Sequence, residues 1–307
     1  MLAFFKAQLH TGTRLQGTAS IVLAVFLLSL SDALVKDAGA RFGLAQIILL
    51  RSLVATVMIA ATLVVIGGPA ALRLRCSLWV WARSLSLAAM WLCYYAALPS
   101  TPFALAAVCY YTSPIWMALM TRILGTHTGK KGWTAVTLSM AGAFLAVGPR
   151  MGALPVTLFL PLAAAAFYAL AGVITWNRCQ KETAGALALN LNLCLGLLAS
   201  GGILALAIMH PSENQGFVFA IWPDLRGADW GLAIILGCLL AVITTLVARA
   251  YRLAPTPLIG VFDTAYLGFA AFWSVVFFDA VPTTPEGIGI ALIALGAIMM
   301  SFQRGRP

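Results

Sequence analysis

The chain has 307 residues, of which 62% are hydrophobic and 9% are charged, and its mean hydropathy is +0.97. No water-soluble domain of this length needs so much apolar surface, so the composition indicates an integral membrane protein. The net charge of +10 would be compatible with a nucleic-acid partner, but the distribution of the cations along the chain argues against one.

Ten apolar runs, each about as long as a membrane-spanning helix, follow one another along the chain. In the first half they lie near 17–35, 43–66, 79–98, 102–122 and 131–147. In the second half they lie near 155–176, 185–209, 230–250, 257–278 and 285–302. The connections between them are too short for a soluble domain. We therefore predict an all-α integral membrane protein with ten transmembrane helices.

Lysine and arginine fall mostly on one side of this predicted topology. With a cytoplasmic N-terminus, 14 of the 19 cations lie on the inner side, four lie on the outer side, and Arg51 lies within a helix. Such an excess in short loops is the positive-inside rule. We expect both termini in the cytoplasm, a bacterial inner-membrane location, a lipid-bilayer environment and no nucleic-acid partner. The long first run, followed by Asp32 and Lys36, predicts a spanning helix rather than a cleavable signal peptide.

A faint repeat relates the two halves. A proline, a tyrosine and a glycine recur at similar spacing, as Pro99, Tyr110 and Gly142 in the first half and Pro255, Tyr266 and Gly296 in the second. The proline and tyrosine are 11 residues apart in both copies, and the proline and glycine are 43 and 41 residues apart. Because each half has five crossings, the second copy enters from the opposite side. We predict two inverted five-helix repeats, residues 1–152 and 153–307.

An inverted repeat has consequences for where a substrate binds. Such folds hold the substrate between the halves near the membrane midplane and alternate access by rocking one half against the other. The small residues around Gly142 and Gly296 predict close packing of the fifth and tenth helices, either within one chain or with a second protomer. We therefore expect a monomer or a homodimer.

Ionisable residues within the predicted spans are candidates for function. Asp32 and Lys36 are one helical turn apart and share a face, and Arg51 lies about two turns into the second helix. These residues either receive a charged group of the substrate from the outer side or pair with one another and fix the first two helices. Asp263 either forms a salt bridge with Arg249 or Arg252 across a short turn or is a protonatable residue that couples proton movement to transport.

Aromatic and polar side chains follow helical spacing on two neighbouring segments. Trp91, Tyr94 and Tyr95 form one stripe in the third helix, and Tyr110, Ser113, Pro114 and Met117 form another in the fourth. Each of these residues alone is explained by core packing. Their hydroxyl groups need partners inside a membrane, however, and their rings can stack on a planar organic group. Pro114 removes a backbone hydrogen bond and is a candidate gating residue.

The second half offers matching residues. Tyr266 repeats the position of Tyr110 and supports a tyrosine pair that lines a cavity, with Trp273 one face further on. Tyr168 completes the predicted ring of binding residues. Asn190 and Asn192 cannot share a helix face, so we expect at most one of them, Asn190, to point inward.

Signatures of enzymes, metal sites and ATPases are missing from the sequence. The three histidines are far apart, and no GxSxG, HExxH or Walker loop occurs. The six cysteines are scattered without a CxxC pair and are expected to be small core residues. We expect no catalytic residue, no metal and no cofactor.

In combination, these features resemble the drug/metabolite transporter superfamily, in its EamA-type branch. The resemblance spans about residues 17–302 and rests on the stretch Asp32-Ala-Leu-Val-Lys36, on Arg51, on Tyr95-Ala-Ala-Leu-Pro99 and on Thr112-Ser113-Pro114. It implies ten helices in two inverted repeats around a central cavity, and a secondary transporter of small organic metabolites that is often an exporter. Many members have a glutamate after the fourth helix. This chain has Leu124-Gly125-Thr126-His127 there and Asp279 after the ninth.

We therefore predict a gradient-driven or facilitative transporter of an amino acid, an amino-acid derivative or a vitamin- or nucleoside-like compound, with protons as the candidate coupling ion. The alternative is a non-transporting membrane scaffold or an intramembrane enzyme.

Overall fold

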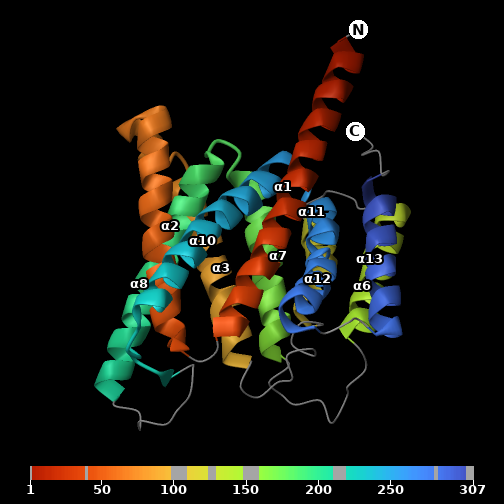
Figure 1. The fold of residues 1–307 in the computed structure, drawn as a ribbon. Coiled ribbons are helices and arrows are strands. Elements are labelled where there is room, and N and C mark those ends of the chain that lie inside the picture. The colour runs from red at the N-terminus through yellow and green to blue at the C-terminus, as the bar shows by residue number, and fades with distance from the viewer. Residues whose placement is uncertain are drawn as a thin grey trace.

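The computed structural model is a bundle of long helices (Figure 1). The structure describes residues 2–38, 41–97, 109–123, 129–147, 159–209, 219–279 and 283–301. Within these residues the regular structure is helical, and no strand is present. The predicted all-helical class is thus confirmed for the described residues. Its physical reason is that a segment crossing a lipid bilayer must satisfy its backbone hydrogen bonds internally.

The helices of the first half follow the predicted apolar runs. They are α1 (Leu2–Ala38), α2 (Leu44–Gly67), the short 3₁₀ helix η2 (Pro69–Leu72), α3 (Ser77–Ala97), α5 (Ser113–Ile123) and α6 (Lys130–Val147). Helix α1 begins well before the predicted run and extends beyond the bundle (Figure 1), although only its stretch Thr13–Leu34 is apolar enough to cross a membrane. Pro99 and the loop Leu124–His127 lie outside the described residues.

The helices of the second half are α7 (Phe159–Arg178), α8 (Ala184–Met209), α10 (Gly227–Leu253), α11 (Thr256–Asp263), α12 (Tyr266–Phe278) and α13 (Thr284–Ser301). Of the stretches that the structure describes, six are long and apolar enough to span a membrane, including α11 and α12 taken together. The start of α1 and the end of α13 lie at the same end of the bundle (Figure 1). Asp279 directly follows α12, has a positive φ of 52° and is exposed.

Two predicted spans are interrupted. The run 257–278 breaks at Thr264 and Ala265, where the Thr264 hydroxyl donates to the Val261 carbonyl at 2.5 Å. The run 102–122 has a turn at Tyr111 and Thr112 before α5 begins. Thr112 likewise donates its hydroxyl to the carbonyl of Cys109, at 2.6 Å. Pro114 has no N–H, so it cannot continue the helical ladder across this turn.

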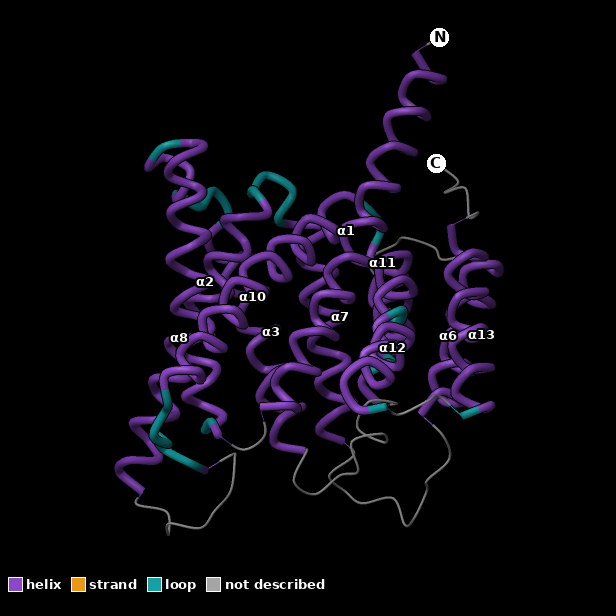
Figure 2. Tube along the Cα trace, in the orientation of Figure 1, coloured by secondary structure: helices purple, strands orange, loops and turns teal. Residues whose placement is uncertain are grey.

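The two halves of the chain interlock. The most extensive helix pairs are α6–α13, α3–α7, α2–α8 and α1–α10, and each joins a helix of the first half to one of the second. Helices α6 and α13 lie side by side at one edge of the bundle (Figure 2). This set of pairs is symmetric between the halves. The counterparts of α3 and α7 are α10 and α1, which also pair, and α2–α8 and α6–α13 each join a helix to its own counterpart.

The glycines of the repeat lie where α6 and α13 meet. A Cβ atom on Gly142 would lie 2.5 Å from the Gly289 carbonyl oxygen, and one on Gly296 would lie 2.9 Å from the Ala135 carbonyl oxygen. Only glycine allows the two backbones to approach this closely. The predicted close packing of these helices is confirmed, and it occurs within one chain.

Candidate functional site

Tyrosines from five parts of the chain meet inside the bundle. Of the seven tyrosines, six form a continuous set of ring contacts that we call the tyrosine cluster: Tyr94, Tyr110, Tyr111, Tyr168, Tyr251 and Tyr266. Helices α3, α7, α10 and α12 and the turn before α5 contribute them. The side chain of Tyr95 lies outside the described part of the structure.

Edge-on and tilted ring contacts connect the tyrosine cluster. Tyr110 lies at its centre, with ring centroids 5.3 Å from Tyr94, 5.6 Å from Tyr111 and 5.6 Å from Tyr168. Tyr111 continues to Tyr266 at 5.8 Å, and Tyr168 continues to Tyr251 at 5.9 Å. Aromatic pairs at these distances and tilts attract each other beyond the effect of their buried area. The structure therefore brings together the predicted residues Tyr94, Tyr110, Tyr168 and Tyr266.

Two aspartates bind hydroxyl groups of the cluster. The Tyr266 hydroxyl donates to Asp32 Oδ2 at 2.6 Å, and the Tyr168 hydroxyl donates to Asp263 Oδ1 at 3.2 Å. Asp32 comes from α1 and is half-buried, whereas Asp263 ends α11 and is buried. A carboxylate inside a membrane bundle is retained where polar partners compensate for its desolvation.

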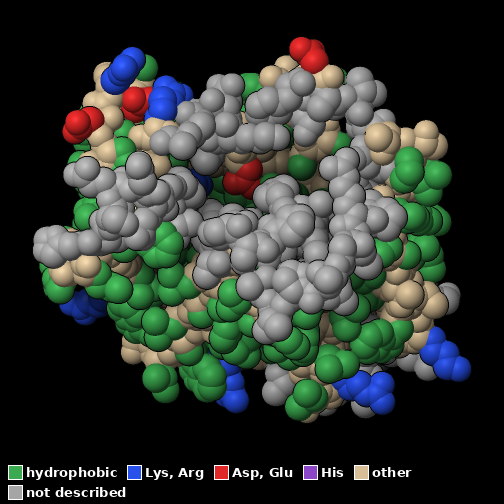
Figure 3. Space-filling view, turned by 90° about the horizontal axis from the view of Figure 1, so that it is seen from below, with side chains coloured by type: hydrophobic (Ala, Val, Ile, Leu, Met, Phe, Trp, Pro, Cys, Tyr) green, Lys and Arg blue, Asp and Glu red, His purple; other side chains and the backbone are tan. Residues whose placement is uncertain are grey.

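The tyrosine cluster has an accessible edge and a closed side. Asp32, Tyr94, Tyr110 and Tyr266 are half-buried. Tyr111, Tyr168 and Tyr251 are buried. Seen from below, the molecule is hollowed, and an acidic side chain is visible inside the hollow (Figure 3). The half-buried members therefore keep part of their surface outside the packed core.

Arg51 lies near the Asp32 end of the cluster. Its guanidinium is buried, donates from Nη2 to Ser31 Oγ at 3.2 Å, and has no hydrogen-bond partner at Nε. It is close enough to Asp32 to interact electrostatically. No ion pair between Asp32 and Arg51 is found in the described structure. The side chain of Lys36 is outside it. Arg51 therefore keeps a donor for a further acceptor.

The predicted salt bridge of Asp263 is wrong. Arg252 donates instead to the Gln180 carbonyl at 3.1 Å, and Arg249 is exposed. Asp263 faces Tyr168 because α11 turns its last residue inward against α7. This leaves Asp263 without an arginine partner among the described residues, as the protonatable alternative requires.

The expectation that only one of Asn190 and Asn192 points inward is also wrong. Both are buried. Asn190 accepts from the Ser84 hydroxyl at 2.6 Å, and Asn192 donates to Thr244 Oγ1 at 3.1 Å. They occupy different faces as predicted, but α8 is covered on both faces, by α3 and by α10. Each asparagine joins two helices, away from the ring contacts of the tyrosine cluster.

The remaining predicted residues surround the cluster. Trp91 packs against the main core, and Ser113 is buried with no partner for its hydroxyl. Pro114 is buried and lies against Gly260 of α11. Trp273 packs on Phe26 at 5.3 Å, and its buried indole N–H is unpaired. Trp273 thus belongs to a separate aromatic group.

Sequence reasoning missed three buried residues. Tyr111 and Tyr251 belong to the cluster, and Arg83, counted as a cation of the inner side, is only 1% exposed. Its Nε donates to Thr175 Oγ1 at 3.0 Å and its Nη1 to the Leu187 carbonyl at 3.1 Å. The sequence feature that could have predicted the burial of Arg83 is its position several residues inside the apolar run 79–98.

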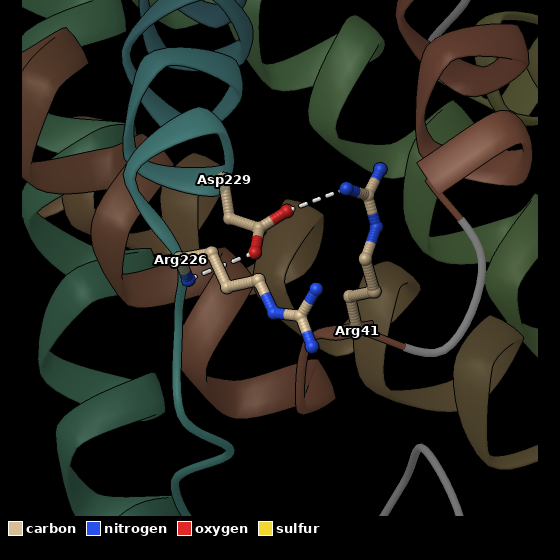
Figure 4. A network of polar contacts seen from close by, with 3 residues as sticks. All are labelled: Arg41, Arg226 and Asp229. Atoms are coloured by element: carbon tan, nitrogen blue, oxygen red, sulfur yellow. Dashed lines mark hydrogen bonds and ion pairs between the residues drawn. The ribbon is translucent and has the colours of Figure 1, made fainter.

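A charged network lies apart from the cluster, between the α1–α2 corner and the start of α10 (Figure 4). Arg41 Nη1 is 2.7 Å from Asp229 Oδ1, and the other oxygen of Asp229 accepts from the Arg226 backbone N–H at 2.9 Å. Asp229 thereby caps the start of α10 and ties it to the segment that precedes α2.

Cys179, which directly follows α7, does not have the lowered thiol pKa of a reactive cysteine. Burial raises the pKa of the Cys179 thiol to about 11, so the thiol is protonated at neutral pH. No group of three histidine, cysteine or acidic side chains that could hold a metal is found among the described residues.

Comparison with known proteins identifies this arrangement. The model of the EamA-like transporter family matches residues 15–148. The first half of the chain is therefore similar to the EamA-like transporter family. Its relatives include the pseudopaline exporter CntI of Pseudomonas aeruginosa, from strains UCBPP-PA14 and PAO1. Each is 26% identical over 289 residues, which are 93% of this chain and 95% of the relative.

The fold is also found in a crystal structure. That structure matches with a TM-score of 0.78 and 21% identity, over 94% of this chain and 97% of the other. An EamA-like member is a multi-pass membrane transporter of small metabolites, and the family and its relatives indicate a transporter rather than an enzyme. The predicted resemblance to this family is confirmed by the match over residues 15–148.

Proposed function

We propose that this EamA-like transporter exports a small zwitterionic organic metabolite, such as an amino acid or an amino-acid derivative, by alternating access. The observation that carries the proposal is the tyrosine cluster, which both halves of the chain supply and which Asp32 and Asp263 bind at its two ends. The exporters of pseudopaline among its relatives support the direction of transport.

The half-buried edge of the cluster supplies complementary groups for a zwitterion. The Asp32 carboxylate suits an ammonium group, and the unpaired Nε of Arg51 suits a carboxylate. The rings of Tyr94, Tyr110 and Tyr266 can stack on the organic part of the substrate. An ammonium group at Asp32 competes with the Tyr266 hydroxyl, so the substrate would displace this tyrosine.

Helix contacts suggest which parts move. Helices α3, α5 and α7 pack together as one group, and α1, α10 and α12 pack as another, while α11 lies between the groups and contacts both. Each group contains helices from both predicted repeats. We therefore propose that these mixed groups are the moving bodies. Residues 1–152 and 153–307 form the two inverted repeats. The breaks at Thr112 and Thr264 are the candidate hinges.

The tyrosine cluster lies between these two groups. The ring contacts Tyr111–Tyr266 and Tyr168–Tyr251 cross from one group to the other, and the hydrogen bond from Tyr168 to Asp263 joins the first group to α11. These contacts close the bundle on the Asp263 side. Protonation of Asp263 would weaken its attraction for the Tyr168 hydroxyl, which makes it the candidate residue for coupling to protons.

The proposed location is the bacterial inner membrane, with both termini in the cytoplasm. The excess of cations on the side of the termini supports this orientation. The small-residue faces of α6 and α13 are used within the chain, which supports a monomer over a homodimer built on these helices.

Flux into proteoliposomes tests the proposal. A panel of radiolabelled amino acids and derivatives is offered to wild type, to Tyr110→Ala and Tyr266→Ala, and to the control Trp230→Phe, which changes an exposed residue. We expect at least one compound to move with wild type and the control and to stop with both tyrosine variants. The transport proposal fails if no compound moves, or if both tyrosine variants transport normally.

A further inference from the structure

The buried guanidinium of Arg83 has no assigned role in the site described above. It is the largest fully buried side chain in the described structure and is held between α3, α7 and α8. Its partners, the Thr175 hydroxyl and the Leu187 carbonyl, are both neutral. These bonds use Nε and Nη1, and they leave the Nη2 group for a further acceptor.

Among the described acidic residues, none forms an ion pair with Arg83. The chain has nine in total. Asp32 and Asp263 bind tyrosines, and Asp229 binds Arg41. Glu182, near the inner start of α3, accepts from the backbone N–H groups of Arg75 and Cys76. The only ion pair within the described residues is Arg41–Asp229.

A buried cation with only neutral partners is costly in a membrane protein, and such residues normally meet an anion during function. A guanidinium presents parallel N–H donors that match a carboxylate. Arg83 is also placed to meet a substrate. Its partner Thr175 lies on α7, the helix that also carries Tyr168 of the tyrosine cluster. Thr175 is about two turns beyond Tyr168 on the same helix face.

We propose that Arg83 is a second substrate site, which binds the carboxylate of the exported metabolite on the cytoplasmic side of the tyrosine cluster. This inference rests on the proposed function and specifies its substrate class as a carboxylate-bearing compound. Arg83 and Arg51 then bind the same group in turn, one on each side of the cluster. Arg83 becomes accessible when the helix groups open toward the cytoplasm.

Chemical labelling of the wild-type protein tests this without knowledge of the substrate. Inside-out membrane vesicles are treated with phenylglyoxal, which modifies accessible arginines, and each arginine is followed by peptide mass spectrometry. One sample contains a pool of L-amino acids, and a second contains the pool of their carboxamides, which lack the carboxylate. Exposed Arg249 is the internal control.

We expect Arg83 to be labelled, and the amino-acid pool to slow its labelling several-fold while the amide pool does not. Labelling of Arg249 should be the same in both samples. If Arg83 stays unlabelled while Arg249 reacts, Arg83 is a permanent structural contact and the proposal is overturned. Equal protection by both pools, or protection by neither, excludes a carboxylate site.

Substitutions give an independent test. Arg83→Met removes the charge but keeps the volume, and we expect an unchanged unfolding temperature with transport of carboxylate substrates lowered about 10- to 100-fold. Arg83→Lys should restore part of it, and Arg249→Met should transport normally. A large loss of thermal stability in Arg83→Met with transport per folded molecule unchanged would overturn the proposal. If wild type transports nothing, the proposed function fails, whereas the labelling result still decides the role of Arg83.

Discussion

Tyr266 and Asp32 are 234 residues apart in the chain, yet the Tyr266 hydroxyl lies 2.6 Å from the Asp32 carboxylate. The bond joins α12 to α1, two helices that pack against each other. It places one member of the repeated tyrosine pair directly on an acidic group of the first helix. The contact therefore links the duplication seen in the sequence to the proposed ammonium site.

Removing only the Tyr266 hydroxyl tests that link. Tyr266→Phe keeps the ring contact with Tyr111 but leaves Asp32 without this donor. A hydrogen bond to a charged group contributes about 1.5–3 kcal/mol, so we expect the unfolding temperature to fall and transport per folded molecule to fall about tenfold or more. Counterflow assays with Trp230→Phe as the control measure this. Wild-type transport kinetics in Tyr266→Phe would contradict a role for the hydroxyl.

Asp263→Asn tests proton coupling. The amide keeps the size of the side chain and its contact with Tyr168, but it cannot gain or lose a proton. We expect pH-driven uptake to be abolished and substrate counterflow at equal pH to be spared. Proteoliposomes with and without an imposed pH gradient separate the two activities. An unchanged response to the gradient would exclude Asp263 as the coupling residue.

Gly142→Ala tests the contact between α6 and α13. The added Cβ would lie 2.5 Å from the Gly289 carbonyl oxygen, so the helices must separate. Overpacking of this kind costs about 1–3 kcal/mol, and we expect a lower unfolding temperature. Gly201→Ala in α8 is the matched control, because a Cβ there meets nothing within 4 Å. The control should be neutral or stabilised by about 0.5–1 kcal/mol. Equal stability of the two variants would contradict the close approach.

The network of Arg41 and Asp229 should contribute little energy. The Arg41 side chain is 50% exposed, and ion pairs of this kind are worth about 0.2–1 kcal/mol. A double-mutant cycle with Arg41→Ala and Asp229→Asn should give a coupling energy in this range that shrinks at high salt. Asp229→Asn alone should still cap α10, because an asparagine side chain can also accept from the Arg226 N–H. A coupling that is insensitive to salt would indicate a buried pair.

The sequence by itself determined where the helices are. Apolar length depends only on transfer to lipid, so the described helices follow the predicted apolar runs, and the resemblance to the EamA-like family is supported by the family match over residues 15–148. The small residues at Gly142 and Gly296 likewise predicted close packing, because only glycine allows backbones to touch. Helical spacing and the repeat also predicted four tyrosines as binding residues, and the structure brings these four together in the tyrosine cluster.

Tertiary structure alone decided the partners of the polar groups. One of the two expectations for Asp263 placed it beside Arg249 or Arg252, its neighbours along the chain, but the orientation of α11 turns it to Tyr168 on α7. Asn192 was expected to face outward, but α10 covers that face of α8. Arg83 looked like one more cytoplasmic cation, and only the packing of α3 against α7 and α8 buries it. Spacing along a helix fixes which residues share a face, whereas the burial and hydrogen bonding of that face depend on which distant helices pack against it.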